Sequence, residues 1–267
     1  MAVNSKIQWC DATWNPARGC DKISDGCKFC YMMRDSHKFG WDGYTVQKTK
    51  TVFNMPLKYK ETKSQMWNGK PLIFTSSLTD VFHQDIDSFR NEIWDIIRKC
   101  PHLIFQVLTK RPERIKEHLP EDWGNGWDNV WLGVSVENNS NNHRVTTLCD
   151  VPSKTRFISA EPLLASTDLL LDHPNIIGKI HWTIIGAESG NDIGKYRYRQ
   201  CELEWIERIV DSCKRTNTAV FVKQLGTHLS KELKLNDRHG GNWDEWDEKC
   251  PHLKIREFPK VSHSIIL

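Results

Sequence analysis

The sequence predicts an α/β protein whose parallel strands form a partial (β/α) TIM-type barrel of about six to seven strands. Its 267 residues suit one large α/β domain. Short apolar runs that end in a polar or charged residue recur along the chain, and helix-like segments separate them. Because strands alternate with helices, we expect parallel βα units.

Six runs are candidate strands, because each is short, apolar and bounded by polar or turn-forming residues. They are PLIFTSSLTD (71–80), HLIFQVLTK (102–110), NVWLGVSVEN (129–138), TRFISAEP (155–162), IHWTIIGAESG (180–190) and AVFVKQLG (219–226). Segments 87–100 and 202–215 carry apolar residues three to four positions apart and are the clearest predicted helices.

The run 129–138 favours a barrel over an open sheet, because alternate residues of a strand point to opposite faces. The two faces consist of Val130, Leu132, Val134 and Val136 on one side, and of Trp131, Gly133, Ser135 and Glu137 on the other. An outer layer of helices would cover the aliphatic set. The mixed set suits the inside of a barrel whose upper end is functional.

An ionisable residue stands at or just after the end of each of these strands. These residues are Asp80, Lys110, Glu137, Glu161, Glu188 and Lys223. The carboxyl ends of barrel strands build the active site, so these groups have a place to converge. Taken singly, each is equally explained as the first solvated residue of a loop.

Composition and charge exclude several classes of protein. The formal charge is +3 and the pI is near 8.3, without the dense basic run of a nucleic-acid-binding arm. No segment approaches the length of an apolar membrane span, and the N-terminus lacks a signal-peptide pattern, so we expect a cytoplasmic protein. With no repeat or linker, residues 1–267 are expected to form a single domain, with a C-terminal extension from about residue 227.

Three of the nine cysteines lie close together in RGCDKISDGCKFCYM (18–32), with the spacing Cys20-x6-Cys27-x2-Cys30. Zinc would need a fourth ligand, either Cys10 or a histidine, yet no second C-x2-C or H-x3-H pair exists. A [4Fe–4S] cluster with three thiolates explains the count better, because its fourth iron stays open. S-adenosylmethionine (SAM) can chelate that iron through its amino and carboxylate groups, and an electron from the cluster can then cleave the sulfonium bond.

Motifs along the whole chain resemble a known family. WNPARGC, SDGCKFCY, SSLTDVFH, LTKRPER, SVEN, AEPLL, GAESG and VKQLG together look like the phage and prophage three-cysteine-motif family of unknown function. That family is itself similar to radical SAM enzymes, particularly the spore photoproduct lyase-like branch. The resemblance implies a radical SAM-type barrel whose cluster, bound by Cys20, Cys27 and Cys30, lies after a first strand around 7–15. The usual radical SAM spacing is C-x3-C-x2-C, whereas the first gap here is six residues.

The resemblance also implies a SAM site. An aromatic residue before the third cysteine would lie beside adenine, the segment after the second strand would meet the amino group, and fourth-strand residues would hold the ribose. The corresponding residues are Phe29 for adenine, then Ser76, Ser77, Thr79 and Asp80 for the amino group, and Ser135 and Glu137 for the ribose. A carboxylate suits a cationic ammonium, and the alternative role of Asp80 is to cap a helix.

Glu161, Glu188 and Lys223 would face the substrate side of the barrel mouth as catalytic residues. A nucleic-acid base or nucleotide is one substrate class, favoured by the resemblance and by the basic and aromatic segments 34–50 and 58–63. A small molecule or a peptide is the other. An external electron donor would be required. The alternative from a different class is a non-catalytic, zinc-stabilised phage DNA-binding protein.

Overall fold

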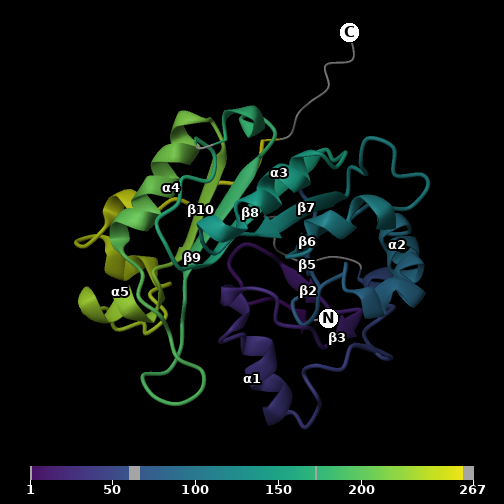
Figure 1. Cartoon of the computed structure of the whole chain (residues 1–267), viewed down its shortest axis with the longest axis horizontal. Coiled ribbons are helices and arrows are strands. Elements are labelled where there is room, and N and C mark those ends of the chain that lie inside the picture. Colours follow the sequence, from purple (N-terminus) through teal and green to yellow (C-terminus); the bar gives the residue numbers. More distant parts are fainter. Residues whose placement is uncertain (1, 60–66, 172, 261–267) are drawn as a thin grey trace.

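The computed structural model of the protein describes residues 2–59, 67–171 and 173–260 (Figure 1). Seven parallel strands form a curled sheet, a half-barrel, in the order β2-β5-β6-β7-β8-β9-β10. Their bounds are β2 (Ala12–Trp14), β5 (Leu72–Thr75), β6 (Ile104–Thr109), β7 (Val130–Ser135), β8 (Thr155–Leu163), β9 (Trp182–Ala187) and β10 (Ala219–Gln224). The predicted fold class and all six predicted strands are confirmed, and the first strand lies within the expected range 7–15.

Two short pairings lie outside the parallel set. Strand β1 (Ala2–Val3) pairs antiparallel with β2 at the edge of the sheet. Strands β3 (Ala17–Arg18) and β4 (Gln47–Lys48) form a separate two-stranded ribbon on either side of the cysteine segment. This ribbon brings residues 17 and 48 together, so the segment between them forms a long loop whose two ends lie side by side.

Helices α2 (Arg90–Arg98), α3 (His143–Cys149) and α4 (Leu203–Arg215) lie on the outer side of the sheet (Figure 1). In α4 the residues Ile206, Ile209, Val210 and Cys213 recur at helical spacing and are buried against the strands. Helix α1 (Tyr31–Lys38) begins directly after Cys30, and α5 (Gly226–Glu232) follows β10. Both predicted helices are confirmed, although residues 84–89 form a 3-10 segment before α2.

The sheet has an outer and an inner core, as the alternation in β7 predicts. Val130, Leu132, Val134 and Val136 belong to the outer core beneath the helices. Trp131 belongs to the inner core, where its ring centroid lies 5.7 Å from that of Trp182. The inner core also includes Leu72, Ile104, Phe157 and Phe221. Most of these residues stand near the starts of their strands, so apolar side chains fill that end of the half-barrel and leave the carboxyl end for polar groups.

The chain after β10 packs back onto the barrel. Trp246 and Leu253 are buried in the outer core. The Trp182 indole donates to the backbone oxygen of Glu257 at 2.8 Å, and the Phe258 ring packs 5.3 Å from Trp182. This segment therefore covers the filled end of the half-barrel. Across the described ranges, no helix is both long and apolar enough to cross a membrane.

Candidate active site

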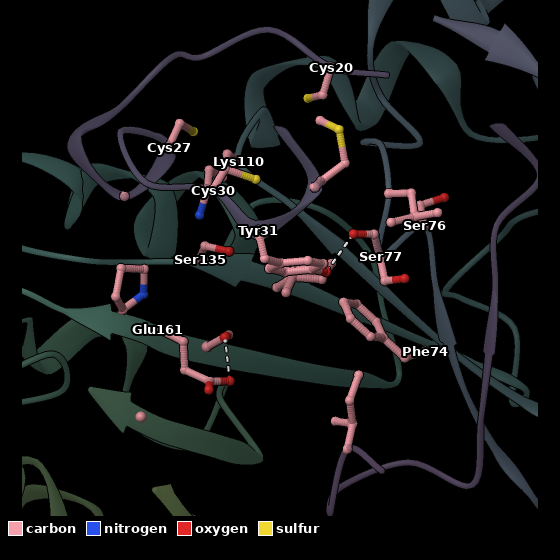
Figure 2. Close-up of a pocket in the computed structure, with 18 of the residues that line it drawn as sticks. Cys20, Cys27, Cys30, Tyr31, Phe74, Ser76, Ser77, Lys110, Ser135 and Glu161 are labelled. Carbon is pink, nitrogen blue, oxygen red and sulfur yellow. Dashed lines mark hydrogen bonds between the residues drawn. The ribbon is translucent and has the colours of Figure 1, made fainter. Parts of the chain in front are cut away.

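A cavity of about 750 Å³ lies at the carboxyl ends of the strands (Figure 2). Its size is within the usual range for a small-molecule or cofactor site. Apart from Glu137, every site residue predicted from the sequence lines it. These residues are Cys20, Cys27, Phe29, Cys30, Ser76, Ser77, Thr79, Asp80, Ser135, Glu161, Glu188 and Lys223. The polar residues at the strand ends therefore converge on one cavity, as the sequence predicts.

The three cysteines surround one end of this cavity (Figure 2). Cys27 ends a short 3-10 helix, and Cys30 caps the start of α1. The loop leaves the ribbon at Gly19, whose φ of +97° favours glycine and where a Cβ would lie 2.2 Å from the Thr45 oxygen. Cys10, the fourth thiol considered for zinc, is instead buried in the inner core.

Burial favours the protonated form of Cys20 and Cys30. It raises the pKa of Cys20 to about 12 and raises the pKa of Cys30 above its ordinary value, so both are neutral without a metal. In the part of the chain that the structure describes, no three Cys, His, Asp or Glu side chains converge on a single metal ion. Ligands of one zinc ion lie within about 4 Å of each other. Each thiolate of an iron–sulfur cluster binds a different iron, so the ligand sulfurs of a cluster lie further apart than those of a single zinc ion.

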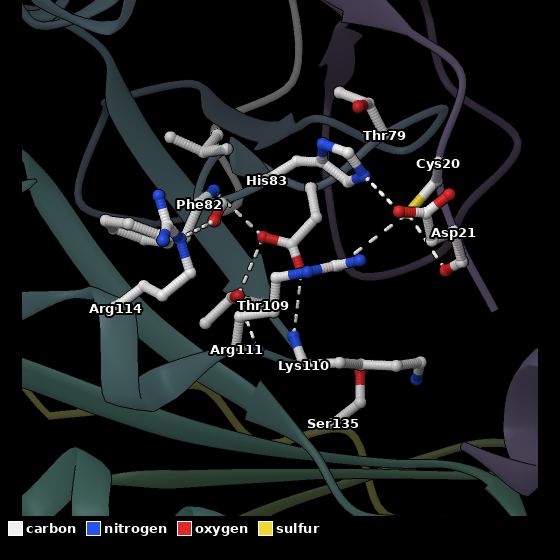
Figure 3. Close-up of polar contacts among 12 residues, drawn as sticks. Cys20, Asp21, Thr79, Phe82, His83, Thr109, Lys110, Arg111, Arg114 and Ser135 are labelled. Atoms are coloured by element: carbon white, nitrogen blue, oxygen red, sulfur yellow. Dashed lines mark hydrogen bonds and ion pairs between the residues drawn. The ribbon is translucent and has the colours of Figure 1, made fainter. Parts of the chain in front are cut away.

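Asp80 anchors a network that reaches Cys20, the first cysteine of the motif, through Arg111. Figure 3 shows Cys20, Thr109, Lys110 and Arg111 of this network. Its Oδ1 accepts from the Phe82 amide at 2.9 Å and the Thr109 hydroxyl at 2.7 Å. Its Oδ2 accepts from the Lys110 amide at 3.0 Å and the Arg111 guanidinium at 3.1 Å. The carboxylate expected to meet an ammonium is therefore already occupied by four donors within the protein.

Glu137 lies against the segment 19–30, which we call the cysteine loop, and does not line the cavity. Its carboxylate is fully buried and contacts Lys110 Nζ at 2.7 Å, Arg144 Nη1 at 2.9 Å and the Ser24 hydroxyl at 2.8 Å. Burial opposes ionisation, but the two cations and Ser24 outweigh it and hold the pKa of Glu137 below its ordinary value. The ionised carboxylate ties the end of β7 to the loop between Cys20 and Cys27.

Glu188 also supports the cysteine loop through a cation. The Arg199 guanidinium donates to Oε1 at 2.6 Å and to Oε2 at 2.8 Å, and it also donates to the backbone oxygen of Asp25 at 3.0 Å. The same guanidinium lies 5.1 Å from the centre of the Phe29 ring. One arginine therefore joins the end of β9 to the segment that contains Cys27 and Phe29.

Glu161 and Lys223 form an ion pair on the other side of the cavity. Lys223 Nζ lies 2.8 Å from Oε1 of Glu161, and the Ser159 hydroxyl donates to Oε2 at 3.3 Å. Gly186 makes room for this pair, because a Cβ there would lie 2.4 Å from Oε1. Among the hydrogen bonds and ion pairs of the described residues, neither group reaches the cysteine loop, and both face the cavity.

In the segment SSLTD (76–80), some side chains hydrogen-bond to neighbouring segments of the protein and one has no such partner among the described residues. Asn15 Nδ2 donates to the Ser77 hydroxyl at 3.0 Å, which ties the segment to the end of β2. The Thr79 hydroxyl donates to the Gly19 oxygen at 2.6 Å, which ties it to the start of the cysteine loop. The Tyr31 hydroxyl donates to the Ser77 backbone oxygen. Ser76 differs: its φ is +68°, and its buried hydroxyl has no hydrogen-bond partner among the described residues. A polar atom of this kind, beside a cavity, is suited to a ligand.

A family model described as "Protein of unknown function (DUF5131)" matches residues 4–251. The chain belongs to this family. No curated protein matches the chain significantly. Neither finding bears on a phage origin.

The fold of this DUF5131 protein is similar to that of spore photoproduct lyase, a radical SAM enzyme. One similar structure is a cysteine-to-serine mutant of the lyase, with a TM-score of 0.55, 13% identity, and coverage of 83% of this chain and 78% of that chain. A second is the lyase complexed with dinucleoside spore photoproduct, with a TM-score of 0.52, 13% identity, and coverage of 82% and 80%. At this identity the likeness establishes the fold.

Two residues important to the site of this DUF5131 protein were not identified from the sequence. Arg111 lies within LTKRPER, directly after the strand-end residue Lys110, and Arg199 lies in the loop after β9. Both connect a strand-end carboxylate to the cysteine loop. One signal was present in the sequence, the position of Arg111 directly after a strand end. The partner of each arginine is a carboxylate elsewhere in the chain, so local sequence cannot show which cations form pairs.

Proposed function

We propose that this protein is a radical SAM enzyme in which Cys20, Cys27 and Cys30 hold a [4Fe–4S] cluster. The observation that carries the proposal is the position of the three cysteines around one end of a cavity, at the carboxyl ends of a half-barrel whose fold is similar to a radical SAM enzyme. No fourth cysteine lines that cavity within the described residues, which suits a cluster with one open iron. When bound, the cluster supplies the electron that cleaves SAM reductively and so starts hydrogen abstraction from the substrate.

The protein's own groups suit SAM at the cysteine end of the cavity. The unpartnered hydroxyl of Ser76 is available to the amino group, while Phe29 would lie beside adenine and Ser135 would meet the ribose. Asp80 and Glu137 would act indirectly, because their carboxylates are occupied by protein donors and fix the loops around the ligand. Ser77 and Thr79 would hold the SSLTD segment in the same way.

The substrate would occupy the side of the cavity formed by Glu161 and Lys223. A charged pair on a fixed surface can orient a polar substrate and keep it close to the SAM ligand. The sequence predicts that Glu188 also contacts the substrate. We propose instead that Glu188 acts indirectly, by holding Arg199, which donates to the backbone oxygen of Asp25 in the cysteine loop.

A nucleic-acid base or nucleotide is the substrate class that we propose. The lyase of similar fold binds a dinucleoside, and the exposed cations Lys6, Lys22 and Arg34 line this cavity and suit phosphate. The segment 34–50 lies in α1 and the chain that follows it, whereas residues 60–63 of the basic segment 58–63 lie outside the described residues. An external electron donor would reduce the cluster.

Anaerobic reconstitution with iron and sulfide tests the metal centre. We expect iron–sulfur absorbance in the wild type, its loss in Cys20→Ala, Cys27→Ala and Cys30→Ala, and its retention in Cys10→Ala, because Cys10 is buried in the inner core. A colourless protein that holds zinc and needs Cys10 would contradict the proposal and favour the zinc-stabilised DNA-binding alternative.

Incubation of the reconstituted protein with SAM and dithionite tests the chemistry. We expect 5′-deoxyadenosine by mass spectrometry, and a modified product when single-stranded DNA, RNA or nucleosides are added. Peptides and small metabolites serve as the comparison set. Product from that set alone would retain the radical SAM activity but contradict the substrate class.

A further inference from the structure

We infer that Arg111 sets the reduction potential of the cluster by donating a hydrogen bond to the sulfur of Cys20 from a guanidinium held in place by Asp80. The inference rests on the proposed function, because it requires that Cys20 ligate a cluster. It assigns to Arg111 a positioning and tuning role that the cysteine motif does not contain.

The contact geometry gives the three cysteines different surroundings. Arg111 Nη1 lies 3.8 Å from the Sγ of Cys20 (Figure 3) and 3.1 Å from the Oδ2 of Asp80. The Cys27 sulfur has a neutral neighbour, the Ser24 hydroxyl at 3.7 Å. The Cys30 sulfur accepts from the backbone amides of Met32 and Met33, which are also neutral. Among the described contacts, Cys20 is therefore the thiol of this motif that has a cationic donor.

Asp80 makes this donor rigid. The carboxylate is itself fixed by the amides of Phe82 and Lys110 and by the Thr109 hydroxyl, so it cannot follow a moving guanidinium. Arg111 is only 8% exposed. A planar guanidinium can donate in two directions at once, to the carboxylate and to the sulfur, which a lysine ammonium on a flexible stem does less well.

Hydrogen bonds and positive charge next to a ligand sulfur stabilise the reduced form of a cluster. Reduction adds one electron, and the added negative charge interacts more favourably with a nearby cation than the oxidised cluster does. Burial strengthens this difference, because water screens the guanidinium only weakly. Removing the guanidinium should therefore shift the equilibrium towards the oxidised cluster.

The test is a redox titration of the full-length, reconstituted protein with dithionite as the electron source and without SAM, monitored by electron paramagnetic resonance. For Arg111→Gln we expect about a tenfold lower ratio of reduced to oxidised cluster at a fixed potential, which for a one-electron couple is about 59 mV towards more negative values. Arg111→Lys keeps the charge and should lie between Arg111→Gln and the wild type.

Arg114→Met is the matched control. Arg114 lies three residues further along the chain, at the end of a short 3-10 helix, where it donates to the Phe82 oxygen and to Asp87. Among the hydrogen bonds of the described residues, none joins Arg114 to a cysteine. Its removal takes away the same charge and should leave the potential unchanged.

The outcomes separate this inference from the proposed function. A wild-type protein that binds no cluster would remove the proposed function itself. A cluster whose potential is the same in the wild type, Arg111→Gln and Arg111→Lys would overturn the role of Arg111 alone. So would an equal shift in Arg114→Met, which would indicate a general charge effect, and so would loss of the cluster from both Arg111 variants with the fold intact by circular dichroism.

Discussion

The backbone of Gly26 lies directly against the carboxylate of Glu137, so that a Cβ at position 26 would lie 2.4 Å from Oε1. Glu137 follows β7 and is held by Lys110 and Arg144, so it cannot move aside without breaking buried ion pairs. Gly26 immediately precedes Cys27. This contact therefore fixes how closely the cysteine loop approaches the barrel.

Gly26→Ala should displace the cysteine loop while the barrel stays folded. The added methyl group collides with an immobile carboxylate, so we expect a large loss of iron and sulfide per chain after reconstitution, with an unchanged far-ultraviolet circular dichroism spectrum. Gly241→Ala is the control for lost backbone freedom, because Gly241 also lies outside the left-handed region and a Cβ there would approach no atom closer than 3.4 Å. Normal cluster content in Gly26→Ala would show that the loop tolerates the displacement.

Glu137→Gln should destabilise the protein in a pH-dependent manner. Removing one partner of a buried ion pair costs about 3 kcal/mol of the free energy of unfolding. The pKa of Glu137 is lowered in the folded state, so its stabilisation is present above the ordinary pKa of 4.5 and is lost as the pH falls through the folded value. Urea denaturation should show a difference between variant and wild type near neutral pH that shrinks below about pH 4. A difference that stays constant over this range would mean that the carboxylate is not ionised at neutral pH.

Asp80→Asn should also destabilise the fold, because an amide group would face donors from Lys110 and Arg111. The expected loss in the free energy of unfolding is about 3 kcal/mol. Asp95→Asn is the surface control: its ion pair with Arg98 is exposed, so about 0.5 kcal/mol or less is expected. Equal denaturation midpoints for Asp80→Asn and the wild type would argue that the carboxylate is free to meet a ligand.

Glu161→Gln and Glu188→Gln should separate substrate orientation from support of the cysteine loop. Glu161 faces the cavity beside Lys223, so its variant should lose product while 5′-deoxyadenosine formation continues. Glu188 holds Arg199, which donates to the oxygen of Asp25, so its variant should reduce both. Identical behaviour of the two variants would contradict this division. Both measurements assume the proposed function and use the reconstituted protein with SAM and dithionite.

Much of the site was visible in the sequence because it depends on local periodicity. The alternation of Val130 to Glu137 predicted which side chains face the helices and which face the barrel interior, because residues of a strand point to opposite faces in turn. The spacing of Cys20, Cys27 and Cys30 placed three thiols on one loop. Charged residues at the strand ends indicated where a cavity would lie.

The sequence by itself determined the half-barrel, the orientation of its strands' side chains and the location of the cysteine loop. Only the tertiary structure decided which strand-end charges pair with one another. Asp80 pairs with Arg111, Glu137 with Lys110 and Arg144, Glu188 with Arg199, and Glu161 with Lys223. Such pairs join residues on different strands, helices and loops, and the twist and curl of the assembled sheet set their distances. A carboxylate that supports a loop and one that faces a ligand are therefore alike in the sequence and differ only in what the fold brings beside them.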